Sequence, residues 1–256
     1  MHIVVFTRST PDTAATITVD ASGRVGWGDA TLIVNPWDEY ALEEAIVRGK
    51  EAGGKATVIA IGGEIHSEAL KHALAMGMDE AIRVDDPALD NADSLAYAVT
   101  AAAAAQKTGA NLILAGKESV DVGSDQHLVQ LARKLGWPYL SNVAHITALS
   151  DTSATVERLI DGGTQTVTCP LPAVMTVTKE INEPRFPSFI GIRKASKAVI
   201  PVWSLAELGV SLPAERAAVV GFRNPPARDA KTEMITGTPA EQAATLVNRL
   251  IEEKVL

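Results

Sequence analysis

The sequence predicts an α/β protein built on a doubly wound, mainly parallel sheet, to which antiparallel strands and a C-terminal arm are added. Three observations support this prediction. Roughly the first 140 residues alternate short buried runs with helical segments at least three times. The pattern then changes to consecutive strand-like runs separated by turns. The chain is 46% hydrophobic but only 4% aromatic, and such a composition suits helices packed on buried parallel strands.

The chain opens with a short, continuous apolar run, HIVVFT at residues 2–7, which predicts a buried strand that the following STPD ends. Residues 16–27 predict a small hairpin, because two β-prone runs flank a Ser-Gly turn. A further short extended segment is expected at residues 31–34.

The first helix is expected to begin at Asn35, a residue type favoured as an N-cap, with Pro36 in the first helical position. Asp38 favours the positive end of this helix, and Gly53-Gly54 ends it. Strands and helices alternate after it. The strands are expected at 55–62, 80–85 and 110–116, and the helices at 66–77, 92–108 and 122–136.

The later part of the chain predicts further strands, some of which extend the main sheet in antiparallel fashion: 142–149, 153–160, 164–171 and 173–179. Residues 202–209 predict a short helix. Residues 213–237 show little periodicity and predict an extended arm, after which Thr238 and Glu241 form the capping box of a last helix. The chain is therefore divided into an α/β domain, 1–212, and an arm with its helix, 213–256. The arm either reaches onto another surface or packs on its own domain.

The composition argues against several classes of protein. A formal net charge of -8 argues against a nucleic-acid binder, which carries a basic face. Cys169 is the one Cys, and the five His show no metal-ligand spacing, so no disulfide framework or metal site is expected. No apolar run approaches the ~18 residues of a membrane-spanning helix, and no targeting segment is recognised, so a cytoplasmic location is expected. No motif points to an enzyme that acts by itself.

Three loops leave the carboxyl ends of the expected strands, where ligands bind on such sheets: 7–13, 62–67 and 116–126. The last, GKESVDVGSDQ, is the best ligand candidate. Its glycines allow close backbone approach, and the amides at the start of the next helix attract phosphate. Taken alone the pattern is not specific, because many loops of this kind look alike. Asp125 would repel phosphate if it pointed inward, and its alternative role is an N-cap.

The segment NEPRFPSFIGIRKASK, residues 182–197, combines aromatic and positive residues in an acidic protein. It holds two of the four Phe, two prolines and four cations. Either the segment folds back and buries its Phe side chains, or it is a docking element for another protein. In the second case an exposed apolar side chain would enter a pocket of the partner, and the cations would steer an acidic surface.

Several stretches together resemble the β-subunit of electron-transfer flavoprotein. They cover nearly the whole chain, in order: MHIVVFTRSTPDT (1–13), NPWDEYALEEAIVRGKE (35–51), ALAMGMDEAIRV (73–84), GKESVDVGSDQ (116–126), ERLIDGG (157–163) and LPAVMTVTKEINEPRFPSFIGIRKASKAVI (171–200). The second and last of these stretches are the most specific.

The resemblance implies a Rossmann-like, adenine-nucleotide-binding α/β fold and an electron carrier that is not a catalyst by itself. It implies an α-subunit that holds most of a redox-active FAD. Electrons would come from dehydrogenases, of the acyl-CoA dehydrogenase type or similar, and pass to a downstream quinone-linked oxidoreductase. The β-subunit would bind AMP in a structural role, or a second FAD as in electron-bifurcating relatives. The arm, 213–256, would pack on the α-subunit.

The resemblance also implies two sets of site residues. The nucleotide would be lined by Phe6, Asn35, Pro36, Trp37, Asp38, Gly63, Gly116, Lys117, Val120, Asp121, Gly123, Ser124, Asp125, Gln126 and His127. Residues 177–199 fall on the partner recognition loop of the family. Docking would use Arg185, Phe186, Phe189, Ile192, Arg193, Lys194 and Lys197.

The chain departs from the family pattern at several of these positions. Phe6 is bulky where a small residue is usual, and Asp125 and His127 also differ, so AMP and FAD both stay open as the nucleotide. Phe189 replaces an exposed Leu, which predicts a partner pocket of different shape. An adenine-nucleotide-binding regulatory protein without redox chemistry is the alternative function. A nucleotide-activating enzyme is disfavoured, because no pyrophosphate-releasing motif or metal carboxylate pattern is found.

Overall fold

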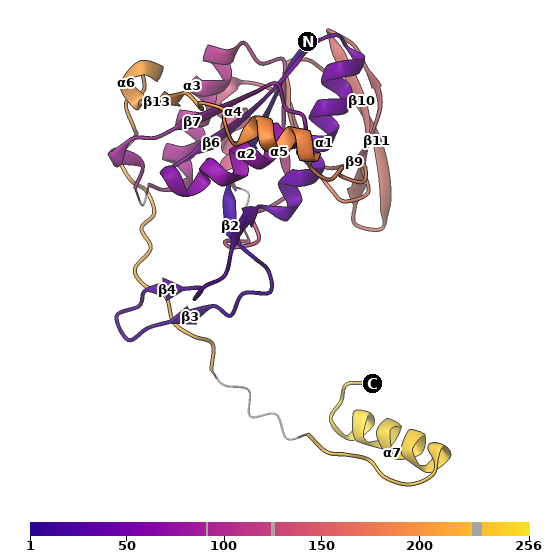
Figure 1. Cartoon of the computed structure of the whole chain (residues 1–256). Helices are drawn as coiled ribbons and strands as arrows, with labels where there is room; N and C mark the ends of the chain where they lie inside the picture. Colours follow the sequence, from indigo (N-terminus) through magenta and orange to yellow (C-terminus); the bar gives the residue numbers. More distant parts are fainter. Residues whose placement is uncertain (91, 124–125, 227–231) are drawn as a thin grey trace. The chain divides into compact units, whose positions relative to one another are not determined.

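The computed structural model describes residues 1–90, 92–123, 126–226 and 232–256. Within them, nine strands form one sheet in the order β11-β10-β9-β12-β8-β1-β6-β7-β13 (Figure 1). Six of its strands run parallel to their neighbours in the centre and on one side: β1 (His2–Thr7), β6 (Lys55–Ile61), β7 (Glu80–Val84), β8 (Leu112–Gly116), β12 (Ala173–Val177) and β13 (Val202–Trp203). The parallel core confirms the predicted α/β class.

Antiparallel strands extend the sheet on the other side, as the sequence predicted. The change of direction occurs at β9 (Tyr139–Leu149), which runs parallel to β12 on one side and antiparallel to β10 (Ser153–Ile160) on the other. The edge strand is β11 (Gly163–Pro170), which pairs antiparallel with β10. The sheet is therefore mixed, with a long hairpin attached to its parallel core.

Helices cover both faces of the parallel strands. Along β1, Ile3 and Val5 belong to a core cluster with α1 (Pro36–Glu51) and α2 (Ser67–Met76). Val4 and Phe6 point to the opposite face and belong to a second cluster with α3 (Ser94–Thr108) and α4 (Gln126–Leu135). This alternation gives a strand that is buried on both faces, which is why it reads as a continuous apolar run.

Shorter elements connect these layers. Two single turns of 3₁₀-helix, η1 (Glu64–His66) and η2 (Pro87–Leu89), follow β6 and β7. The predicted hairpin within 16–27 is present as β3 (Thr18–Val19) and β4 (Val25–Gly26). It lies beyond a two-stranded ladder of β2 (Ser9–Pro11) and β5 (Leu32–Val34), away from the main sheet (Figure 1).

Two local predictions need correction. Val202 and Trp203 were expected in a helix, but they pair with Arg83 and Val84 as the edge strand β13, and only α6 (Leu205–Leu208) is helical. The segment 182–197 was expected to be a loop, but part of it is the helix α5 (Phe189–Ala195). Ser188 caps this helix, because its hydroxyl accepts a hydrogen bond from the amide of Gly191.

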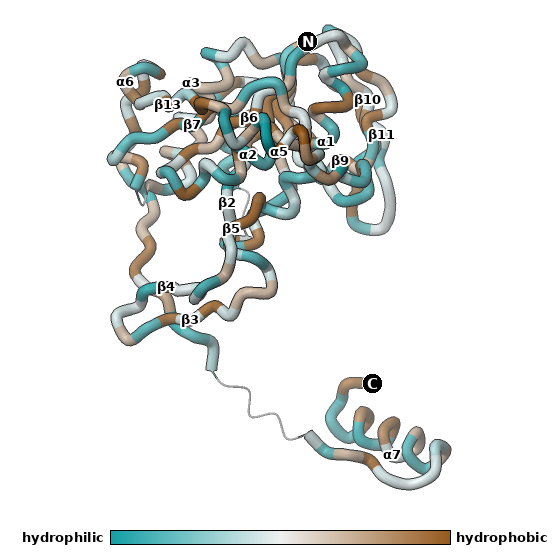
Figure 2. Tube along the Cα trace, viewed as in Figure 1, coloured by the Kyte–Doolittle hydropathy of each residue, from teal (hydrophilic) through white to brown (hydrophobic). Residues whose placement is uncertain are grey.

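The chain divides into two compact units, Met1–Phe222 and Arg223–Leu256. The second unit contains α7 (Pro239–Glu252), whose predicted capping box of Thr238 and Glu241 is confirmed. No residue of α7 is buried, and apolar side chains alternate with hydrophilic ones along it (Figure 2). That this helix packs on an α-subunit stays a prediction. In the described part of the chain, no helix is both long enough and apolar enough to cross a membrane.

We predict that Gly116→Ala lowers the free energy of unfolding by about 1–3 kcal/mol, because overpacking forces the surrounding backbone apart. A Cβ atom at Gly116 would lie 2.6 Å from the carbonyl carbon of Trp37 and 2.7 Å from Oδ1 of Asp38. Gly163→Ala on β11 is the control, since a Cβ there meets nothing within 4 Å. Urea unfolding of both variants and the wild type measures the difference. Equal unfolding midpoints for the two variants would show that the close approach of α1 to Gly116 does not contribute to stability.

Candidate functional site

Residues from six parts of the fold meet beyond the carboxyl ends of β1 and β8. They come from the end of β1, the start of α1, the end of β8, the loop 117–123, α3 and α4. Between them lies a cavity of about 20 Å³, lined by Phe6, Thr7, Arg8, Asn35, Asp38, Tyr97, Ala115, Gly116, Glu118, Ser119, His127 and Leu128. The site thus lies where ligands bind on open parallel sheets.

Asn35 holds the loop after β8 and does not cap α1, which corrects the sequence prediction. Its side-chain amide donates to the carbonyl of Glu118 at 2.9 Å and accepts from the amide of Val120 at 3.2 Å. No side-chain hydrogen bond caps the helix start. Since both ends of one amide bind the loop, Asn35 fixes residues 118–120 against α1.

Asp38 is a buried carboxylate that connects three elements. Oδ2 accepts a hydrogen bond from the hydroxyl of Thr7 on β1, and Oδ1 accepts one from the amide of Gly116 on β8, both at 3.0 Å. The residue is only 5% exposed. Burial raises the pKa of the Asp38 carboxyl from 3.8 to about 7, against the opposing effect of its hydrogen bonds. The Asp38 carboxyl therefore titrates near neutral pH.

Arg8 brings positive charge to the cavity. Its guanidinium pairs with Asp121 at 2.9 Å, and the hydroxyl of Ser119 also donates to Asp121. The Nε atom of Arg8 is buried and has no hydrogen-bond partner among the described residues. Lys117 lies over the ring of Trp37, 4.3 Å from its centroid. A guanidinium nitrogen without an acceptor can bind an anionic or carbonyl oxygen of a ligand.

Three rings form the remaining wall. Phe6 is buried, and Tyr97 meets His127 edge to face with centroids 4.7 Å apart. Burial lowers the pKa of His127 to about 4 and raises that of Tyr97, so both rings are neutral at physiological pH. Nearby, burial also lowers the pKa of His66 to about 4, and its ring nitrogen Nδ1 accepts from the amide of Ser9 at 3.1 Å.

The chemistry of this site fits an adenine nucleotide, but its volume does not. The rings can stack on a base, and Arg8 can bind a phosphate oxygen. About 20 Å³ holds roughly one water molecule, whereas ligand pockets measure about 300–1,000 Å³. A nucleotide can enter only if the loop 117–123 and its contacts move.

Only some of the predicted nucleotide residues line this cavity: Phe6, Asn35, Asp38, Gly116 and His127. Trp37, Lys117, Val120 and Asp121 contact the loop or the start of α1 around it. The cavity is not lined by Pro36, Gly63, Gly123 or Gln126. Ser124 and Asp125 lie outside the described residues.

Sequence reasoning missed Thr7, Arg8 and Tyr97 as individual site residues. Thr7 and Arg8 end the first strand and open one of the three candidate loops, so their position was a usable signal. Tyr97 is the one aromatic residue in the Ala-rich stretch 94–108. The usable signal is that one large side chain stands among small ones, and this side chain lines the cavity.

The segment 182–197, for which docking was predicted, exposes its aromatic side chains. Phe186 is 95% and Phe189 85% exposed, and Ile190 and Ile192 are exposed beside them. The hypothesis that the segment folds back and buries its Phe side chains within Met1–Phe222 is therefore wrong. Arg185 does not project freely, since its guanidinium pairs with Glu43 at 2.7 Å. Other cations of the segment, Arg193, Lys194 and Lys197, are exposed.

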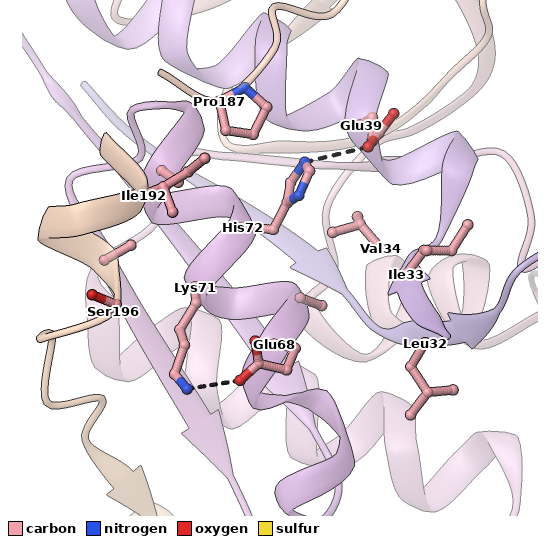
Figure 3. Close-up of a pocket in the computed structure, with 13 residues that line it drawn as sticks. Leu32, Ile33, Val34, Glu39, Glu68, Lys71, His72, Pro187, Ile192 and Ser196 are labelled. Atoms are coloured by element: carbon pink, nitrogen blue, oxygen red, sulfur yellow. Dashed lines mark hydrogen bonds and ion pairs between the residues drawn. The ribbon is translucent and has the colours of Figure 1, made fainter. Parts of the chain in front are cut away.

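A groove of about 420 Å³ runs beside this segment (Figure 3). Pro187 and Ile192 form one wall, and residues of β5 and α2 form the others. Two polar contacts lie at its rim: the ion pair of Lys71 with Glu68 at 2.7 Å, and His72 Nε2 at 3.3 Å from a carboxylate oxygen of Glu39. No local pattern predicts this groove, because most of its walls come from residues 32–34, 68–75 and 187–196, which are far apart along the chain.

Comparison with known proteins agrees with this arrangement. The family profile described as "Electron transfer flavoprotein domain" matches residues 29–208. The "Electron transfer flavoprotein subunit beta" of Bacillus subtilis (strain 168) is 32% identical over 256 residues, which cover 99% of this chain and 98% of that protein. The corresponding subunit of Clostridium acetobutylicum is 31% identical, with 99% of both chains covered.

The chain belongs to the electron transfer flavoprotein β-subunit family. A β-subunit of this family carries electrons and is not a catalyst by itself, and it has an α-subunit as its partner. A further relative is the "Caffeyl-CoA reductase-Etf complex subunit CarD" of Acetobacterium woodii, 34% identical over 264 residues that cover both chains completely. The family predicted from the sequence is therefore confirmed.

We predict that Asp38→Asn makes this flavoprotein subunit more stable than the wild type, increasingly so as the pH rises from 4 to 7. The pKa of Asp38 is about 7 in the folded chain and near 3.8 in the unfolded chain. Between these two pH values the folded chain binds more protons at Asp38 than the unfolded chain does, so the free energy of unfolding of the wild type falls as the pH rises. The slope cannot exceed about 1.4 kcal/mol per pH unit. Asn can still accept from Gly116 and donate to Thr7.

Urea unfolding of both proteins from pH 4 to 8 measures this difference. Asp20→Asn is the control: hydrogen bonds from Ser22 and from the backbone of Arg24 lower the pKa of Asp20, so this variant should not gain stability as the pH rises. A stability difference at Asp38 that does not change with pH would contradict the assignment of a raised pKa.

Proposed function

We propose that this chain is the β-subunit of a heterodimeric electron-transfer flavoprotein that receives electrons from a dehydrogenase through an FAD held mostly by the α-subunit. A downstream quinone-linked oxidoreductase takes the electrons. The observation that carries the proposal is the similarity, over nearly the full chain, to β-subunits of electron transfer flavoprotein. The exposed side chains of Phe186 and Phe189 also support it, because a partner protein can bind them.

Phe186 and Phe189 form the proposed docking surface, with the cations beside them. An electron carrier must bind its partner and release it quickly, and this favours a small interface with one apolar anchor. Burying a Phe side chain contributes about 1.5–3 kcal/mol, enough to place a contact without making it permanent. Arg193, Lys194 and Lys197 supply positive charge that attracts an acidic partner surface. Arg185 is excluded from this steering role by its pairing with Glu43.

The partner dehydrogenase is proposed to act on coenzyme A esters. The relative CarD belongs to a complex with caffeyl-CoA reductase, and this supports a partner enzyme whose substrate is a coenzyme A ester. The arm and helix of residues 213–256 are proposed to pack on the α-subunit, because α7 has an apolar stripe and no buried residue of its own.

An adenine nucleotide is proposed to bind beyond β1 and β8, with Arg8 beside its phosphate and the rings of Phe6, Tyr97 and His127 around its base. The unpartnered Nε of Arg8 supports an anionic ligand. The narrow cavity requires the loop 117–123 to open for entry. The ligand is AMP in this proposal, since AMP needs less space than FAD. When bound it supplies no redox chemistry and stabilises the fold.

Identification of the nucleotides released from the purified αβ complex tests this function. We expect one FAD and one AMP per heterodimer after denaturation. Two FAD would replace AMP by a second flavin at the loop 117–123 and make electron bifurcation the working hypothesis. A complex without any flavin would contradict an electron carrier and favour the non-redox, nucleotide-binding regulatory protein.

Phe189→Ala should slow electron transfer from the dehydrogenase while the flavin content stays unchanged. Loss of about 1.5–3 kcal/mol of apolar contact corresponds to roughly a 10–150-fold lower second-order rate constant. Stopped-flow reduction of the complex by the reduced dehydrogenase measures it. Ile17→Ala, which also truncates an exposed apolar side chain, should leave the rate unchanged. Equal rates for the wild type and the Phe189 variant would remove this residue from the docking surface.

A further inference from the structure

The segment before α5 is attached to α1 by a buried glutamate. Glu43 accepts three hydrogen bonds from Arg185: two from the guanidinium at 2.7 Å and one from the backbone amide at 3.1 Å. The partners lie 142 positions apart in the sequence. A bidentate pair with an added backbone contact fixes both the position and the orientation of the chain at Arg185.

The neighbouring glutamate makes a second attachment. Asn182 donates to the Glu44 carboxylate at 3.1 Å and to the carbonyl of Tyr40 at 3.0 Å. Arg48 also donates to Glu44, at 2.8 Å, and reaches the carbonyl of Ile146 on β9 at 2.9 Å. The attachment therefore continues from the docking segment through α1 to the sheet.

Both glutamates are buried: Glu43 is 7% and Glu44 4% exposed. Burial raises the pKa of Glu43, but the hydrogen bonds and charge of Arg185 outweigh it and hold that pKa below its usual value. A buried carboxylate is costly unless it is paired. The covering segment 182–185 pairs Glu43, and together with Arg48 it supplies the partners of Glu44.

Close backbone packing fixes the other end of the segment. A Cβ at Gly191 would lie 2.3 Å from the carbonyl oxygen of Ala75, so α5 lies directly against α2. The hydroxyl of Ser188 accepts from the amide of Gly191 at 2.9 Å and starts the helix between these contacts. Phe186 and Phe189 stand between two fixed points and remain exposed.

We propose that Glu43 and Glu44 are positioning residues for docking, which hold the exposed Phe186 and Phe189 in their binding orientation before the partner arrives. This proposal rests on the proposed function for its kinetic consequence. An anchor that is ordered in the free protein loses less entropy on binding. If ordering fails, the apparent affinity falls in proportion to the fraction of molecules that keep the binding conformation.

The experiment uses the full αβ complex with Glu43→Gln, a substitution that keeps the size of the side chain but removes its charge. The first readout is amide hydrogen exchange of residues 183–195, which needs no partner. The second is reduction of the complex by an acyl-CoA dehydrogenase that reduces the wild type. If the ordered fraction falls to about one tenth, we expect about a tenfold higher KM for the dehydrogenase, with kcat and flavin content unchanged. Amide exchange should be faster as well, by the factor by which the open fraction rises.

Glu51→Gln is the matched control. Glu51 lies on the same helix and pairs with Arg48 at 3.0 Å, but its side chain is 60% exposed and does not touch the segment. Exchange and KM should both stay at wild-type values. Arg185→Gln removes the same ion pair from its exposed side and serves if Glu43→Gln does not fold. The double variant should lose no more than either single variant, because the two residues act through one contact.

The outcomes separate the inference from the function on which it rests. Unchanged exchange in both single variants would overturn the attachment, whatever the electron-transfer rates. Faster exchange with an unchanged KM would overturn the positioning role. A wild-type complex that accepts no electrons from any acyl-CoA dehydrogenase would overturn the docking proposal together with the proposed function, while the exchange data would still decide whether Glu43 orders the segment.

Discussion

The buried carboxylate of Asp38 is the interaction on which the site depends. It accepts from the side chain of Thr7 and the backbone of Gly116, so it joins β1, β8 and the first turn of α1 in one place. Those three elements end at the same edge of the sheet because the strands are parallel. With Gly116 packed against Trp37, no side chain can separate β8 from α1. The loop that follows β8 therefore starts from a fixed position, and Asn35 extends the same connection to residues 118–120.

Helix α1 serves both functional regions. Its first turn shapes the narrow cavity, and its later turns carry the glutamates that bind the segment before α5. The helix is thus a common support for the proposed nucleotide site and the proposed docking surface. This explains why a surface helix of this fold buries three carboxylates, Asp38, Glu43 and Glu44: each of them satisfies polar groups from another part of the chain.

Local patterns in the sequence predicted the fold class and most elements, but not these contacts. Continuous β-branched runs identified β1 and β6, and the capping box of Thr238 and Glu241 identified the start of α7. Asn35 looked like an N-cap because the residue type and the following Pro fit that role locally. Its partners are 83 and 85 positions away, and no local rule reports them. The contacts of Glu43 and Glu44 could not be predicted either, because nothing near them in the sequence indicates that residues 182–185 cover them.

The small size of the cavity has a consequence for the rate at which the proposed nucleotide exchanges. About 20 Å³ is too small for a nucleotide, so the loop 117–123, which Asn35 and the ion pair of Arg8 with Asp121 hold, has to move before a nucleotide can enter. The same opening is needed for departure, so residence inside is set by loop opening rather than by affinity alone. A molecule enclosed during folding would exchange slowly with the surroundings and would persist through purification. The subunit would then behave as though its occupant were part of the polypeptide.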